Sequence, residues 1–223
     1  MKRVHVICEG QTEETFVNAL LCPHLAAFDV SPVAALVGKP GHKGGHVTTA
    51  RMARDIRLRL MQDKQAWCTT FFDYYGLAPE FVGKAEARLL ATFDEKAKTV
   101  ETALRNQVLA QTDADAIRRF IPYIQMYEFE GLLFSEPQRL AAGLYAKGLE
   151  HDLAAIRTAF STPEEINDSP ETAPSKRIIG LLPSYDKPLC GSLAAIEIGL
   201  PQIRRECRRF NAWVLRLEHL GAQ

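Results

Sequence analysis

The chain has 223 residues, of which 47% are hydrophobic and 24% charged, and its 27 lysines and arginines balance 27 aspartates and glutamates. This composition is typical of a globular protein with a full hydrophobic core, and it excludes disordered and collagen-like chains. No apolar run approaches the roughly 20 residues that cross a bilayer, and the first residues turn acidic before a signal-peptide core could form. We therefore expect no membrane partner and a cytoplasmic location.

The five cysteines are scattered without a C-x-x-C pair, which argues against a zinc ribbon or a redox motif. Residues 3–8 have the β-branched character of a strand, and the pattern breaks directly after them, at Glu9. A helix should open at Gln11 with Thr12 as its N-cap. We expect Pro23 to end or kink this helix.

A second apolar stretch, residues 33–37, leads into a glycine-rich loop, residues 38–46, that does not match the Walker A spacing. The loop carries Lys39 and Lys43. A helix should follow, capped by Thr48 or Thr49, with one apolar face and with Arg51 and three more arginines elsewhere. A phosphate-facing surface and a solvated helix face are both open interpretations. His42 and His46 would suit a transition metal only on a helix, and here they lie in the loop.

Two later strand signals also end on acids. Residues 66–72 run into Asp73, and residues 120–127 run into Glu128 and Glu130. Between them lies a helical stretch, residues 79–111, with a candidate break near residues 92–94. Alternating strands and helices of these lengths predict βαβ units and a parallel sheet flanked by helices, and ligands bind outside the carboxyl ends of such strands.

From residue 136 onward the pattern changes. We expect a helix at residues 138–160, an extended proline-rich segment at residues 161–188 and a final helix at residues 200–219. Five arginines in this last helix give it a local positive charge. The predicted organisation is an α/β core, residues 1–135, and a C-terminal helical extension, residues 136–223, that folds back to supply basic groups.

Carboxylates at the ends of neighbouring strands repel one another unless a cation neutralises them. Mg²⁺ or Mn²⁺, which prefer oxygen ligands, suit Glu9, Asp73 and Glu128 or Glu130 better than Zn²⁺ does. Such a centre can polarise a phosphodiester and generate the attacking hydroxide. Against this stand structural interpretations: Glu9 as a helix cap, and Asp73 as a turn residue linked to Gly76.

Residues 8–17 resemble the glutamate-bearing first motif of toprim domains, above all in overcoming-lysogenization-defect nucleases and RloB-like proteins. The resemblance makes Glu9 and Glu13 the two acids of the motif, although Glu13 could also be a solvated first-turn acid. The Asp-x-Asp of the family is here Asp73-Tyr74-Tyr75, with only its first acid. Residues 128–134 look like the Phe-Glu-x-x-Leu segment of RloB-like proteins, which implies Glu130 as the third acid.

Nearly the whole chain also resembles a bacterial domain-of-unknown-function family with a toprim-like core. That family occurs in defence and mobile gene clusters, often beside an ATPase gene. The matching segments, in chain order, are residues 71–77, 123–134, 172–177 and 203–213. The family usually has histidine where Tyr127 stands.

The resembled nucleases use a late lysine to stabilise charge on the phosphate, which favours Lys176 here and then Lys187. Each of them could instead be a solvated surface cation. The candidate nucleic-acid contacts are Lys39, Lys43, Arg51, Arg177 and Arg204. Tyr74 and Tyr75 fit a core or rim position, and also a stacking platform.

The expected function is Mg²⁺- or Mn²⁺-dependent cleavage of DNA or RNA in a bacterial phage-defence or mobile-element system. The alternative is a non-catalytic partner of a neighbouring ATPase, in which the absent second aspartate reflects lost catalysis. The oligomeric state stays open.

Overall fold

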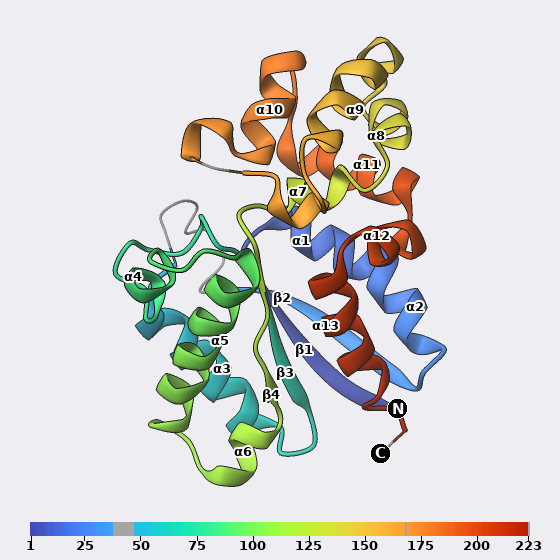
Figure 1. The fold of residues 1–223 in the computed structure, drawn as a ribbon. Coiled ribbons are helices and arrows are strands. Elements are labelled where there is room, and N and C mark those ends of the chain that lie inside the picture. The colour runs from blue at the N-terminus through green and yellow to red at the C-terminus, as the bar shows by residue number, and fades with distance from the viewer. Residues whose placement is uncertain (38–46, 168, 223) are drawn as a thin grey trace.

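The computed structural model describes residues 1–37, 47–167 and 169–222. Its centre is a parallel sheet in the order β2-β1-β3-β4, with β5 also paired to β3 (Figure 1). The strands are β1 (Lys2–Cys8), β2 (Val30–Leu36), β3 (Trp67–Asp73), β4 (Phe120–Ile121) and β5 (Ile124–Gln125). The α/β fold with a parallel sheet flanked by helices is therefore as predicted.

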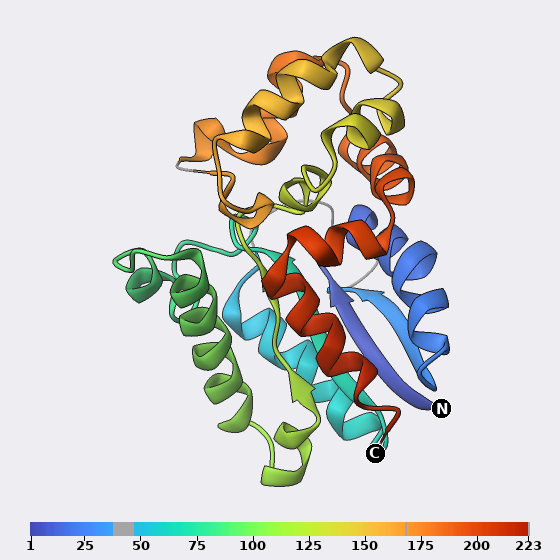
Figure 2. The same cartoon turned by 45° about the vertical axis from the view of Figure 1, so that its right-hand side comes forward.

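Alternation along the strands gives the sheet two apolar faces. Val4 and Val6 of β1 and Phe71 of β3 belong to one buried cluster, whereas Ile7 and Phe72 belong to the other. The first cluster is covered by α1 (Gln11–Phe16), α2 (Cys22–Ala26) and α13 (Arg208–Glu218), and the second by α3 (Thr49–Gln62) and α5 (Phe93–Leu109). Figure 2 shows α13 lying along its face of the sheet.

The first helix departs from the prediction at both ends. Its N-cap is Gly10, and Thr12 is buried within the first turn, so the predicted Thr12 cap is wrong. The Glu13 carboxylate accepts the Gly10 N–H instead, at 2.9 Å. Pro23 does not end the helix: α1 continues through a π-helical turn, Val17–Leu21, directly into α2. This irregular turn just before Pro23 accommodates a residue that has no N–H.

The helical stretch predicted at residues 79–111 is divided as expected. α5 begins at Phe93, and the Thr92 side chain caps it by accepting the Glu95 N–H at 3.2 Å. The part before the break contains only the short α4 (Lys84–Ala87). α6 (Ala114–Arg118) then leads into the last strands.

The strand predicted at residues 120–127 is split into β4 and β5. Pro122 lies between them and lacks the N–H that a continuous ladder needs. The Thr70 side chain takes over at this point, since its hydroxyl donates to the Tyr123 carbonyl at 2.8 Å and accepts the Tyr123 N–H at 3.0 Å. β5 then pairs Gln125 with Asp73, so the edge of the sheet still reaches the carboxyl end of β3.

The C-terminal part is more broken, and more helical, than predicted. Residues 138–160 form α8 (Pro137–Gly143) and α9 (Glu150–Thr158), and residues 161–188 include α10 (Pro174–Leu181) instead of running extended. Four prolines of this segment, Pro163, Pro170, Pro174 and Pro188, begin helical turns, where no N–H is required, and Pro183 lies in a turn. The remaining helices are α7 (Glu130–Leu133), α11 (Ser192–Ile198) and α12 (Leu200–Glu206). Short turns complete the described elements: the π turn Lys187–Gly191 and the 3₁₀ turns Lys147–Leu149, Pro163–Glu165 and Pro170–Thr172.

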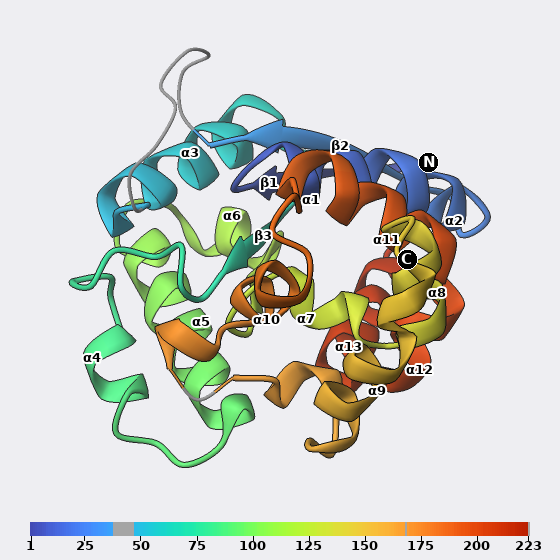
Figure 3. The same cartoon turned by 90° about the horizontal axis from the view of Figure 1, so that it is seen from above.

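The predicted final helix is interrupted at Cys207, which is extended and separates α12 from α13. α13 packs on the sheet through Phe210 and Trp213, and the Trp213 indole N–H donates to the Thr69 hydroxyl at 2.8 Å. Seen from above, α7 and α10 lie over the end of β3 (Figure 3). No helix in the described ranges is long and apolar enough to cross a membrane.

Candidate functional site

Two acids meet where β1 and β3 end. Glu9 follows β1 directly and Asp73 is the last residue of β3; because these parallel neighbours end at the same edge, the two side chains converge. A Glu9 carboxylate oxygen accepts the Asp73 backbone N–H at 3.2 Å. The same carboxylate lies against Gly76, where a Cβ would overlap it. The turn after β3 therefore holds Glu9 in place.

Glu13 adds a third acid from the first turn of α1, where it is buried. Its contact with the Gly10 N–H makes it a capping residue. Burial, followed by the charge of Asp73, raises the pKa of Glu13 to about 7, so it also belongs to the acid cluster. It is not the solvated first-turn acid of the structural interpretation.

Glu130 and Lys187 complete the arrangement. Glu130 is the fully buried first residue of α7, and the Tyr185 hydroxyl donates to it at 3.2 Å. The Lys187 ammonium, at the start of the π turn, donates to an Asp73 oxygen at 2.9 Å and lies 3.1 Å from a Glu130 oxygen. The acid cluster, defined as Glu9, Glu13, Asp73 and Glu130, thus shares one lysine.

One ammonium cannot neutralise four carboxylates. Burial, with repulsion from Asp73 next, raises the pKa of Glu9 to about 8. Burial likewise raises the pKa of Glu130 to about 7, against the attraction of Lys187, and raises that of Asp73. Burial opposes the charge of Lys187, but the Asp73 and Glu130 carboxylates outweigh it and raise its pKa. Near neutral pH the cluster therefore favours bound protons or a further cation.

The acid cluster fits a hard divalent cation by charge and by donor chemistry. All its donors are carboxylate oxygens, and one Asp73 oxygen is buried with no hydrogen-bond partner. The side-chain positions differ from those of a finished metal site: among the residues described, no three His, Cys, Asp or Glu side chains are grouped to hold a metal ion. Lys187 lies between Asp73 and Glu130 instead.

A cavity of about 340 Å³ opens beside the acid cluster. Glu9, Glu13 and Lys187 line it, together with Arg51 of α3. The Arg51 guanidinium donates to the Val37 carbonyl at 2.9 Å. Of the predicted nucleic-acid contacts that the structure describes, Arg51 is the one that lines this cavity.

Glu128 and Lys176 lie outside the acid cluster as defined, although the Glu128 charge still acts on it: after burial, it is among the causes that raise the pKa of Asp73 and of Glu130. The Glu128 carboxylate accepts the Ser175 N–H at 2.8 Å and so caps α10, whereas Glu130 points into the site because a helix begins there. Lys176 is exposed on α10, which forms where the sequence predicted extended chain. Lys187, which contacts Asp73 and Glu130, is therefore placed better than Lys176 for the predicted role of the late lysine.

Two other predicted cations are held in structural contacts. Arg177 donates to the Thr172 carbonyl at 2.8 Å and lies over the Phe160 ring. Arg204 pairs with Glu218 and donates to Asn211 at 2.7 Å. The last set of predicted residues, Lys39, Lys43, His42 and His46, lies outside the described residues.

Aromatic rings border Asp73. Tyr74, Tyr75 and Tyr127 lie with ring centroids 5.7–6.3 Å apart, and the Tyr75 hydroxyl accepts from the Asn167 amide. Tyr75, which stands at the position of the missing second aspartate, is thus held by the C-terminal part. Tyr127 has a left-handed backbone, φ 62°, directly before the Glu128–Glu130 segment.

Sequence reasoning missed two residues of the site. Gly76 was considered only as the turn partner of Asp73 and as part of a matching segment, and nothing local shows that its missing Cβ makes room for Glu9. Tyr185 is 55 positions from Glu130 and carries no motif of its own. Both depend on contacts between distant parts of the chain.

Comparison with curated proteins gave no match, and neither did comparison with solved structures. A family model described as a domain of unknown function, DUF4276, matches residues 8–218. The match includes every member of the acid cluster as well as Lys187, α10 and all of α13. The chain therefore belongs to the DUF4276 family.

Proposed function

We propose that the protein is a metal-dependent nuclease that hydrolyses phosphodiester bonds of DNA or RNA, in a bacterial defence or mobile-element system. The supporting observation is the acid cluster with its shared Lys187 at the carboxyl edge of the sheet. The toprim-like motif around Glu9 and Glu13 supports the same reaction class.

The residues divide into two roles. Glu9, Asp73 and Glu130, with Glu13 beside them, would hold Mg²⁺ or Mn²⁺, which when bound polarises the phosphate and activates water. Lys187 would stabilise the negative charge that develops on the phosphate oxygens. Arg51, at the adjacent cavity, would bind a neighbouring phosphate. Tyr185 positions Glu130 through its hydroxyl.

A second function, that of a non-catalytic partner of an ATPase, is favoured by one observation. Lys187 already pairs with Asp73 and Glu130, and Tyr75 replaces the second aspartate, so the cluster is partly neutralised without metal. On that proposal the toprim-like core serves as an interaction scaffold. Co-purification with the ATPase, unaffected by Glu9→Gln, would favour it.

The decisive experiment incubates the purified protein with plasmid DNA and with tRNA in MgCl₂, MnCl₂ or EDTA. We expect cleavage in MgCl₂ or MnCl₂ and none in EDTA. Asp73→Asn and Lys187→Met should each reduce the rate by about 100-fold or more, the usual scale for losing a group that stabilises transition-state charge. Lys176→Met is the matched control, since Lys176 is exposed, and should cleave like wild type.

Metal binding is measured separately by thermal unfolding. Mn²⁺ should raise the Tm of the wild type, and raise it less in Asp73→Asn. A wild type that neither cleaves nor gains stability with Mg²⁺ or Mn²⁺ would disprove the nuclease proposal. Normal cleavage by Lys187→Met with loss in Lys176→Met would disprove the assignment of the lysine.

A further inference from the structure

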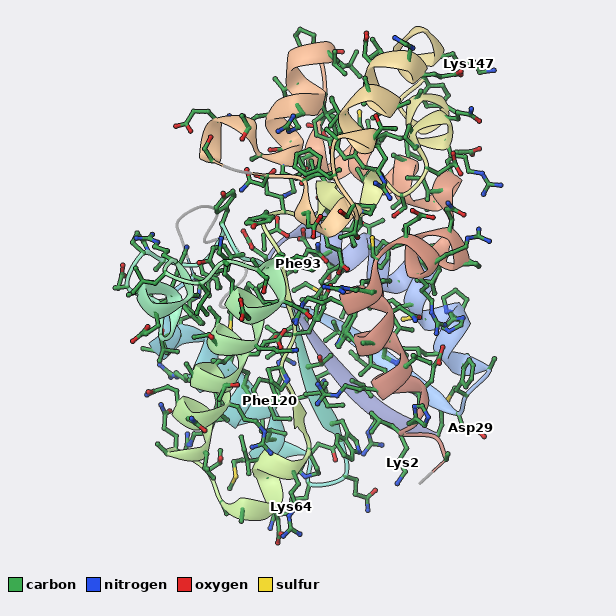
Figure 4. The ribbon with its side chains drawn as sticks, in the orientation of Figure 1. Lys2, Asp29, Lys64, Phe93, Phe120 and Lys147 are labelled. Atoms are coloured by element: carbon green, nitrogen blue, oxygen red, sulfur yellow. The ribbon has the colours of Figure 1, made fainter. Side chains whose placement is uncertain are left out.

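A second cavity, of about 440 Å³, lies at the β4–β5 edge of the sheet, away from the acid cluster. α5 and α13 form its walls, and the Tyr123 segment between β4 and β5 forms its floor. These helices cover opposite faces of the sheet, so the cavity bridges the two faces across the edge. Figure 4 places Phe93, the first residue of α5, just below the C-terminal helices.

The charged side chains around this cavity are mainly basic. The cations are Lys98, Arg208, Arg209 and Arg216, and the acids are Asp94 and Glu101. Four positive charges against two negative ones leave a local excess of two in a chain with no net charge. Three of these cations come from α13, so the arginines of the last helix gather on one side of it.

Arg209 is used within the fold. Its side chain is only 10% exposed; it pairs with Glu101 and lies 3.3 Å from an Asp94 oxygen. Glu101 in turn accepts the Ile124 N–H at 2.9 Å, which ties α5 to the edge strand. Glu101 is therefore neutralised internally, and Asp94 faces the remaining cations.

The other three cations are available to a ligand. Lys98 and Arg208 are each 68% exposed and lie only loosely, at 3.7 Å, from Asp94. Arg216 is exposed and makes no ion pair within the described residues; its charged surroundings include Glu101 and Arg105. We call Lys98, Arg208 and Arg216, with the cavity between them, the basic groove.

We infer that the basic groove binds the phosphate backbone of a nucleic acid. Exposed guanidinium groups suit phosphate oxygens, and three cations sharing one loosely paired acid favour a polyanion over a neutral ligand. The two rings that line it, Tyr123 and Trp213, are stacked on each other with centroids 4.5 Å apart and are buried, so the groove offers no free ring surface for bases. Binding should thus be insensitive to sequence.

The groove and the acid cluster lie toward the same end of the molecule. α5 begins at this end, and α13 also starts there and runs back along the sheet (Figures 1 and 2). A strand held in the groove would therefore lie at the end of the molecule that carries the acid cluster. The inference rests on the proposed function only in making this nucleic acid the substrate, and binding can be measured without cleavage.

The test is fluorescence anisotropy in EDTA with labelled single-stranded DNA, single-stranded RNA and duplex DNA of random sequence. Arg208→Gln/Arg216→Gln should weaken binding at least about tenfold and lower the slope of log K against log salt by about two. The control Arg3→Gln/Arg118→Gln removes two largely exposed arginines from β1 and α6, outside the groove and the cavity beside Glu9, and should bind like wild type. Lys98→Gln should weaken binding a few-fold. The labelled strands show which nucleic acid is preferred.

The inference would be overturned if Arg208→Gln/Arg216→Gln bound the probes with the same affinity and salt slope as the wild-type protein. It would also be overturned if the wild-type protein bound none of the probes. Equal Tm values for the two double variants guard against a folding defect. Asp73→Asn separates the two proposals: it should bind nucleic acid normally and fail to cleave it. If the groove double variant bound nucleic acid normally while the wild type showed metal-dependent cleavage, the groove inference would be refuted and the nuclease proposal would stand.

Discussion

The Glu9 carboxylate occupies space that only a glycine leaves free at position 76. This contact links the ends of β1 and β3, because Glu9 also accepts the Asp73 N–H at 3.2 Å. Glu9 is thus positioned by its hydrogen bond from the Asp73 backbone and by the space that Gly76, without a side chain, leaves for its carboxylate. Moving its carboxylate by about an ångström is enough to disturb a catalytic geometry.

Gly76→Ala tests this contact. The added methyl group must displace Glu9, so we expect a loss of about 1–3 kcal/mol of unfolding free energy, metal-dependent cleavage reduced at least tenfold, and a smaller Mn²⁺-induced rise in Tm. The measurements are urea unfolding, plasmid cleavage and thermal melting.

Gly180→Ala is the matched control. Gly180 lies in α10, and a Cβ there meets no atom within 4 Å. A glycine-to-alanine change inside a helix should be neutral or stabilise the protein by up to about 1 kcal/mol. If Gly76→Ala behaved like Gly180→Ala in all three measurements, the assigned role of Gly76 would be wrong.

At the level of elements, the exposed edge of the sheet is closed by side chains from α5 and α13. Arg209 reaches from α13 to Glu101 on α5, and Glu101 holds the Ile124 N–H of β5. Arg209 also lies 5.9 Å above the Tyr123 ring. Edge strands need such cover, because their unpaired backbone groups otherwise attract other chains.

Arg209→Met should be strongly destabilising. It leaves Glu101 buried without its guanidinium, which typically costs about 3–5 kcal/mol. Arg208→Met, one position earlier and largely exposed, should cost about 1 kcal/mol or less. Chemical denaturation of the two variants checks the difference, and equal losses would contradict the closing role of Arg209.

The sequence predicted elements best where the signal was local. The strands at residues 3–8 and 66–72 are apolar and rich in β-branched or aromatic residues, and both formed. The strand at residues 120–127 was split by Pro122, and its repair by Thr70 depends on a neighbour about 50 positions away. The prolines of residues 161–188 predict extended chain, whereas Pro163 and Pro174 begin helical turns.

The candidate site shows the same contrast between local sequence signals and contacts of distant residues. The acids at the strand ends could be placed from the sequence, because parallel strands end at one edge. The choice between Lys176 and Lys187 could not, since it depends on how the segment between α10 and α11 folds back onto the sheet. The same holds for Tyr185.

Across the whole molecule, the balance of 27 basic and 27 acidic side chains conceals a division of charge. The acid cluster lies at the carboxyl edge of the sheet and the basic groove at the β4–β5 edge. Net neutrality therefore does not argue against a nucleic-acid partner. Because four buried acids share one lysine, the stability of the protein without bound metal depends on the protonation of these carboxyls.

That dependence has a definite sign. In the folded protein burial raises the pKa of Glu9 to about 8, and those of Glu13 and Glu130 to about 7, from an ordinary value of 4.5. Between about pH 4.5 and 8 the folded state holds protons that the unfolded chain has released. The stabilising contribution is complete below this window and is lost as pH rises through it.

In thermal melts in EDTA from pH 5 to 8.5, Tm should therefore fall as pH rises, because the acid cluster loses its protons. Glu9→Gln removes the carboxyl with the highest of these pKa values and should flatten the decline, whereas Glu80→Gln, an exposed acid outside the cluster, should leave it unchanged. Mn²⁺ should counteract the loss most at the alkaline end, where deprotonated carboxylates are available to bind it. If Glu9→Gln and wild type declined in parallel, Glu9 would not carry the buried proton that its position between Asp73 and Gly76 implies.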